Sequence, residues 1–181
     1  IMASTGNVGE KGVLRWDAPE GEWIVLRTGM ALTGTQNAPA SPESTGYEID
    51  KMSKAAASGH FDAYVGEIIR RIPPEKRKGF RHVVADSYEQ GSETWTEGFG
   101  ELFEKEYGYS PYPWMPVLTG RIVESADRSD RFLWDLRRLV ADRIAIDYVG
   151  GLREKCEENG LRLWLENYGH WGFPAEFLNY G

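Results

Sequence analysis

The sequence contains almost no cysteine, no long apolar run and no excess of positive charge. Cys156 is the single cysteine among 181 residues, so the chain by itself forms neither an internal disulfide nor a thiolate metal cluster, and Cys156 is expected to fill core space. The longest apolar stretches, such as residues 23–26 and 83–85, are far shorter than the roughly 20 residues that cross a bilayer. A net charge of −7 disfavours binding to a phosphate backbone, which depends mainly on lysine and arginine. We therefore expect neither a membrane span nor a nucleic-acid partner.

Aromatic residues are abundant. The chain has 7 Trp, 9 Tyr and 7 Phe, more than a core of this size obviously requires. Flat rings can bury the apolar faces of a sugar while its hydroxyl groups stay free for hydrogen bonds. The composition therefore agrees with a carbohydrate ligand, and the alternative is that most of these rings fill the core.

Strands and helices are predicted to alternate along the chain. Short β-branched and apolar runs predict strands at residues 23–27, 80–86 and 161–166. Apolar residues at helical spacing predict helices at residues 53–72 and 129–158. Thr94 and Glu97 form a capping-box pattern that would open another helix, Gly108 would close it, and a last helix is expected near Pro174. This order is typical of an α/β protein whose strands are parallel and joined by right-handed crossovers.

A barrel fits this order better than a nucleotide-binding sheet, because none of the predicted strands is followed by the glycine-rich phosphate turn of such sheets. A complete (β/α)8 TIM-type barrel takes about 250 residues, whereas this chain supplies about three strands. We therefore expect a partial barrel from a longer enzyme. In this interpretation residues 1–20 are a linker or the tail of a preceding module, and residues 21–181 belong to the catalytic barrel.

Two polar clusters follow predicted strands, where barrel enzymes carry their working residues. DSYE ends with Glu89, and ENYGHW begins with Glu166. Cleavage of a glycosidic bond needs one carboxyl group that protonates the leaving oxygen and a second that activates water or attacks carbon. Glu89 and Glu166 are therefore candidate catalytic residues. The alternative is that such acids cap helix N-termini or pair with arginine.

Several stretches, taken together and in order, resemble glycoside hydrolase family 106, the α-L-rhamnosidases. They include GEWIVLRTGMALTG (residues 21–34), GYEIDKM (46–52), DSYEQGSETWTEGF (86–99), GYSPYPWMPVLTGRIV (108–123) and LENYG (165–169). The resemblance implies a (β/α)8 catalytic barrel, hydrolysis of terminal α-L-rhamnosyl residues of plant or microbial glycans with inversion, and a calcium ion near the sugar. It also suggests a periplasmic or secreted bacterial enzyme, although residues 1–9 lack a signal-peptide pattern and leave the localisation open.

Carried over residue by residue, the resemblance supports Glu89 and Glu166 as the catalytic pair, with acid and base unassigned. It places a further set of residues around the sugar: Asp50, Lys51, Asp86, Tyr88, Asn167, Tyr168 and His170. Three of these have structural alternatives, because Asp50 can cap the next helix, Lys51 can be a solvated surface charge and Asp86 can hydrogen-bond its own turn. No contiguous calcium loop is present, so calcium ligands would be dispersed, and none is named.

The expected inversion also predicts a distance. Inverting enzymes hold their two carboxyl groups roughly 6.5–9.5 Å apart, and we expect this spacing between Glu89 and Glu166, on strand ends that are not immediate neighbours. The alternatives to an enzyme are a non-catalytic carbohydrate-binding protein and an inactive piece of a barrel.

Overall fold

The structure of the chain is a computed structural model that describes residues 12–86, 93–166 and 177–180. It comprises two compact units, of which the first holds Ile1–Met30 and Gly98–Asp135 and the second holds Ala31–Glu97 and Leu136–Gly181. The described elements alternate between helices and strands, so the α/β class is confirmed. The assignment of residues 1–20 to a preceding module and of residues 21–181 to a barrel stays a prediction. None of the described helices is both long and apolar enough to cross a membrane.

Helix α1 (Lys54–Arg71) is capped at its start by Ser53. The Ser53 hydroxyl oxygen accepts a hydrogen bond from the Ala56 N–H at 3.2 Å, which satisfies one of the unpaired donors at the helix start. The buried residues recur every four positions and therefore lie on one face of the helix: Ala57, Phe61 and Val65. The predicted helix at residues 53–72 is confirmed.

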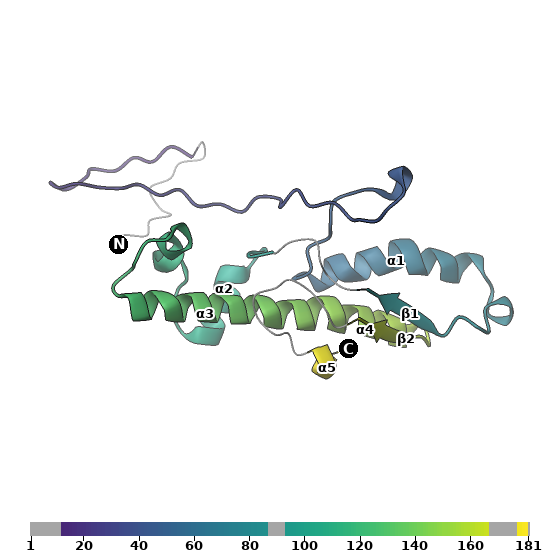
Figure 1. Cartoon of the computed structure of the whole chain (residues 1–181). Coiled ribbons are helices and arrows are strands. Elements are labelled where there is room, and N and C mark those ends of the chain that lie inside the picture. The colour runs from purple at the N-terminus through teal and green to yellow at the C-terminus, as the bar shows by residue number, and fades with distance from the viewer. Residues whose placement is uncertain (1–11, 87–92, 167–176, 181) are drawn as a thin grey trace. The chain divides into compact units, whose positions relative to one another are not determined.

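Strands β1 (His82–Ala85) and β2 (Arg162–Leu165) are parallel and lie side by side (Figure 1). Their register pairs His82 with Arg162 and Ala85 with Leu165. Along both strands, alternate side chains lie on opposite faces of the sheet. One face packs against the core, whereas Val84 and Trp164 on the other face are 60% and 57% exposed. The parallel arrangement of these two predicted strands is confirmed.

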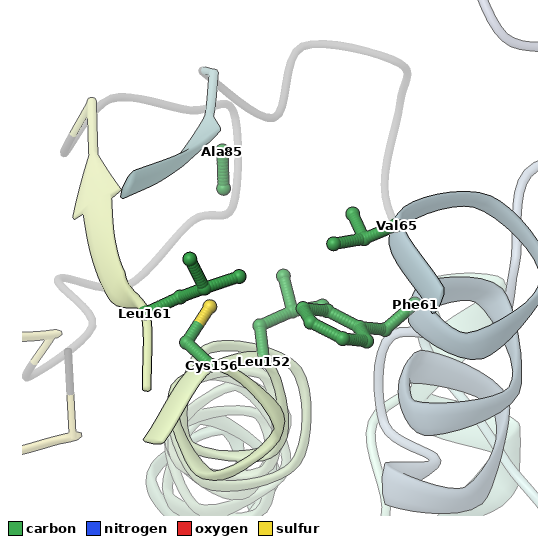
Figure 2. Packing of buried hydrophobic residues seen from close by; sticks show 6 residues of the cluster. All are labelled: Phe61, Val65, Ala85, Leu152, Cys156 and Leu161. Atoms are coloured by element: carbon green, nitrogen blue, oxygen red, sulfur yellow. The ribbon is translucent and has the colours of Figure 1, made fainter. Parts of the chain in front are cut away.

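The core of the second unit lies between α1, the helix α4 (Gly150–Glu158) and one face of this sheet (Figure 2). Its buried members are Phe61, Val65, Ala85, Leu152, Cys156 and Leu161. Figure 2 shows the side chains of α1 directed towards those of α4, with the sheet residues beside them. Cys156 is fully buried, which confirms that it fills core space.

Residues 126–158 form one helical run with a wider segment in its middle. Helix α3 (Ala126–Arg143) leads into the π-helical segment η4 (Ile144–Val149), which continues into α4. The predicted helix at residues 129–158 is confirmed, but its apolar pattern did not reveal the π-helical segment. Gly151 permits the close approach of α1, because a Cβ at this position would lie 3.2 Å from the Lys54 Cγ.

The first unit has an aromatic core. It is built by helix α2 (Phe99–Tyr107), the 3-10 segment η3 (Tyr112–Thr119) and the first part of α3. The rings in contact are Phe103, Tyr107, Tyr109, Trp114 and Phe132. Phe103 and Phe132 are fully buried, so for these two rings the core-filling interpretation is correct. Three short described elements remain: η1 (Pro42–Ser44), η2 (Pro74–Lys76) and α5 (Phe177–Tyr180).

The strand predicted at residues 23–27 is wrong for this structure. The segment has no strand assignment, and Ile24 and Val25 are 73% and 62% exposed. Its local contacts are made by Trp23, whose ring packs edge-on against Trp16 at 5.0 Å and whose Nε1–H donates to the Pro19 carbonyl at 2.9 Å. A strand needs a hydrogen-bonded neighbour, and within the described part of the chain this segment has no paired strand.

The capping box predicted at Thr94 and Glu97 is also wrong. Helix α2 begins later, after Gly98, which has a left-handed backbone with φ of 72° and makes no side-chain cap. The hydroxyl group of Thr96, in the same segment, instead donates a hydrogen bond to the carboxylate of Asp50. Gly108, with φ of 75°, ends α2 as predicted.

Candidate active site

Asp86 and Glu166 lie next to each other at the carboxyl end of the sheet. Each follows its strand directly, and the Glu166 N–H donates to the Ala85 carbonyl at 3.0 Å, which continues the ladder one step beyond the strands. The backbones of neighbouring strands are about 4.8 Å apart, so the backbones of Asp86 and Glu166 lie side by side. Both are exposed. We call them the strand-end pair.

Alternation along the strands indicates which face the strand-end pair shares. Residues 82, 84 and 86 follow one another on one face of β1, and residues 162, 164 and 166 do so on β2. This is the face opposite to the helices α1 and α4, because the alternate residues Val83 and Leu163 pack against the core. The expectation that the strand ends are not immediate neighbours is therefore wrong, since β1 and β2 are hydrogen-bonded to each other.

A second group of polar residues lies at the start of α1 and comprises Asp50, Lys51, Glu93 and Thr96. We call it the polar cluster. The Lys51 N–H donates to both carboxylate oxygens of Glu93, at 3.1 Å and 2.9 Å. Asp50 accepts the Met52 N–H at 2.8 Å with Oδ1 and the Thr96 hydroxyl at 2.5 Å with Oδ2. The polar cluster thus joins segments that are more than 40 residues apart in the sequence.

The Lys51 side chain is buried, at 3% exposure, so the alternative of a solvated surface charge is wrong. Its ammonium group pairs with Glu48 at 2.5 Å and lies 5.7 Å from the centre of the Tyr148 ring. Asp50 does not act as the helix cap, because Ser53 has that position. Asp50 and Lys51 therefore both make internal contacts, and their assignment to the sugar pocket stays a prediction.

Two acidic groups in this part of the second unit have raised pKa values. The pKa of Glu93 is raised to about 7, chiefly by burial and also by the charge and hydrogen bond of the Asp50 carboxyl, while Lys51 acts in the opposite direction. Burial raises the pKa of Asp147, in the π-helical segment, and Arg143 opposes this rise through an ion pair. Near neutral pH, the Glu93 carboxyl is therefore protonated in a substantial fraction of the molecules.

The family model of alpha-L-rhamnosidases, glycoside hydrolase family 106, matches residues 1–181. The chain belongs to this family. It is 37% identical over 181 residues to a protein of Formosa agariphila that carries the name "Putative beta-glucuronidase". The match includes 100% of this chain but only 15% of the length of that relative. Among solved structures it matches a rhamnosidase from Novosphingobium sp. PP1Y with a TM-score of 0.76 and 33% identity, covering 90% of this chain and 16% of that one. The family resemblance of the sequence is confirmed.

Five of the residues that the family resemblance assigns to the site lie outside the described residues: Tyr88, Glu89, Asn167, Tyr168 and His170. Their roles, and the predicted distance between Glu89 and Glu166, stay predictions. Glu93 and Thr96 were missed by sequence reasoning, although both belong to the family-106-like stretch at residues 86–99. Their position in that stretch was the available signal, whereas no local pattern indicates contacts with residues 50 and 51.

Calcium, which membership of family 106 implies, is not matched by a site in the described part of the chain. There, no group of three or more His, Cys, Asp or Glu side chains is placed to hold a metal ion. In the polar cluster, the Asp50 and Glu93 oxygens accept protein donors, and the Lys51 ammonium is paired with Glu48. The described residues therefore do not fit a calcium site.

Proposed function

We propose that the protein carrying this chain is an inverting α-L-rhamnosidase that removes terminal rhamnosyl residues from plant or microbial glycans. We further propose that the chain contributes about two strands to its (β/α)8 barrel. The supporting observation is the strand-end pair, which brings Asp86 and Glu166 together at the carboxyl end of two neighbouring parallel strands. That end is where barrel enzymes hold their reacting groups.

In this proposal Glu89 and Glu166 are the two catalytic carboxyl groups. Glu89 is three residues after Asp86 in the sequence, and Glu166 is exposed directly after β2. One carboxyl protonates the glycosidic oxygen, so the bond to the anomeric carbon breaks and the leaving group departs as an alcohol. The other takes a proton from a water molecule that attacks the opposite face of the sugar.

The residues around this pair would bind the sugar. Asp86 shares the sheet face of Glu166 and is suited to accept hydrogen bonds from sugar hydroxyl groups. The other proposed ligands are Asp50, Lys51, Tyr88, Asn167, Tyr168 and His170. Exposed Trp164, on the same sheet face as Glu166, offers a flat ring of the type that packs on sugars.

The substrate class can be tested with the full-length protein and a panel of aryl glycosides. We expect release of the aryl group from an aryl α-L-rhamnoside at a kcat/KM at least about 100-fold above that for an aryl β-D-glucuronide, because the active site of a glycosidase discriminates in the transition state. The glucuronide is the informative comparison, since the Formosa agariphila relative carries that activity in its name.

Two other results would contradict the proposal. Hydrolysis of the glucuronide alone would contradict the rhamnoside as substrate. Binding of free rhamnose in a titration, without release of any aryl group, would instead support a non-catalytic carbohydrate-binding protein.

A further inference from the structure

Two exposed apolar side chains lie next to the strand-end pair on the same face of the sheet. Val84 on β1 is the register partner of Trp164 on β2, and the two side chains are 60% and 57% exposed. They share the face of Asp86 and Glu166, because each lies two residues before one of these acids and strand side chains alternate between faces. We call Val84 and Trp164 the apolar pair. The face therefore changes from two carboxyl groups to an apolar surface within about 7 Å along the strands.

The basic residues of this face lie farther from the acids. His82 and Arg162 are register partners, and both are exposed. They come two residues before the apolar pair, and thus about 13 Å along the strands from Asp86 and Glu166. Among the described residues of this face, the neighbours of the strand-end pair are therefore apolar and not basic.

This order of groups fits a sugar whose substituent on C5 is apolar. In a pyranose, C1 and C5 are both bonded to the ring oxygen, so a ring held with C1 at the strand-end pair can place its C5 substituent on the apolar pair. In a 6-deoxyhexose this substituent is a methyl group, which gains free energy when it leaves water for an apolar surface. In a glucuronide it is a carboxylate, to which the side chains of Val84 and Trp164 offer no cation, and desolvation of an unpaired carboxylate is costly. Ionised Asp86 or Glu166 would also repel it.

We propose that the apolar pair is the subsite for the C5 methyl group of a 6-deoxyhexose, with Val84 and Trp164 as specificity-determining residues. This inference rests on the proposed function, and it names the part of the sugar that the site selects. One methylene-sized group in an apolar site changes kcat/KM by about 10- to 200-fold. The subsite is therefore expected to have an effect of this size.

The test uses the full-length protein and three aryl glycosides that differ only in the substituent on C5: the α-L-rhamnoside with a methyl group, the α-L-lyxoside with hydrogen and the α-L-mannoside with a hydroxymethyl group. The parent protein is expected to prefer the rhamnoside over the lyxoside by at least about tenfold in kcat/KM. Trp164→Ala is expected to lower this ratio at least about fivefold, whereas Trp164→Phe, which keeps a flat apolar ring, should retain it within about twofold.

A second variant does not depend on removal of a large side chain. Val84→Thr keeps the shape of valine and adds a hydroxyl group, so it is expected to raise kcat/KM for the mannoside relative to the rhamnoside by at least about threefold. The control is Tyr64→Ala, because Tyr64 is 65% exposed on helix α1. It should leave all ratios at the values of the parent protein.

A ratio of two kcat/KM values from one sample is independent of the folded fraction, because the concentration of active enzyme cancels. The intrinsic reactivity of each glycoside cancels when variants are compared. An unchanged rhamnoside-to-lyxoside ratio in Trp164→Ala, or an unchanged mannoside-to-rhamnoside ratio in Val84→Thr, would overturn the subsite, and this is the result expected if these side chains only fill the interior of the full-length protein. A parent protein that releases no aryl group from the rhamnoside would instead contradict the proposed function itself.

Discussion

Glu166→Gln in the full-length protein is expected to lower kcat for an aryl α-L-rhamnoside by about 100- to 10,000-fold, which is the usual contribution of a general acid or base. Glutamine keeps the shape of the side chain but cannot deliver or take the proton. The Glu166 backbone N–H, which donates to the Ala85 carbonyl at 3.0 Å, is unaffected by this change. The melting temperature should therefore stay nearly unchanged. Steady-state kinetics and a thermal melt measure the two effects.

Glu101→Gln is the matched control, because Glu101 is an exposed glutamate on helix α2. It should leave both kcat and the melting temperature at the values of the parent protein. Glu89→Gln is expected to resemble Glu166→Gln. If Glu166→Gln unfolded the protein and spared the activity of the folded fraction, Glu166 would be a structural ion-pair or capping residue instead.

Phe61→Ala is expected to cause the largest loss of stability in the second unit, about 3–5 kcal/mol. Phe61 is 1% exposed and packs between α1 and α4 with Val65, Leu152 and Cys156 (Figure 2). The substitution removes buried apolar surface and leaves a cavity that the surrounding helices fill only in part. Hydrogen exchange at the backbone amides of β1 and β2 measures the free energy of opening of this unit in the full-length protein.

Tyr64→Ala is the control on the same helix, because Tyr64 is 65% exposed. It should change the free energy of opening by no more than about 0.5 kcal/mol. Equal effects of Phe61→Ala and Tyr64→Ala would contradict the assignment of Phe61 to the core.

The elements that the sequence predicts correctly are those specified by their own periodicity. Helix α1 has a buried residue at every fourth position, and Pro73 follows shortly after its end, and both are local signals. The two strands of the sheet were recognised from short apolar runs, and the alternation of helices and strands predicted that they are parallel. The segment at residues 23–27 has the same kind of apolar run. It is not a strand here, because strand formation depends on a paired neighbour and not on composition alone.

In the candidate site as well, local sequence patterns predicted some features, whereas contacts between residues far apart in the sequence were not predicted. The rule that barrel enzymes act at strand ends selected the two clusters that begin with Asp86 and Glu166, but only the register places these two residues side by side. The capping-box pattern at Thr94 and Glu97 was misleading. The polar residues beside it, Glu93 and Thr96, make hydrogen bonds with Lys51 and Asp50 and not with the start of α2. Asp50 and Lys51 were selected as sugar ligands, and their internal contacts with Thr96 and Glu93 depend on folding across more than 40 residues.

Proton NMR of an aryl α-L-rhamnoside during digestion by the full-length protein is the most direct test of the proposed activity. We expect β-L-rhamnose to appear first and the α anomer to form later by mutarotation, since a water molecule attacks the face opposite to the leaving group. This result agrees with a separation of roughly 6.5–9.5 Å between the carboxyl groups of Glu89 and Glu166. Initial release of α-L-rhamnose would contradict inversion and the proposed roles of this pair, and the absence of any released rhamnose would contradict the proposed activity.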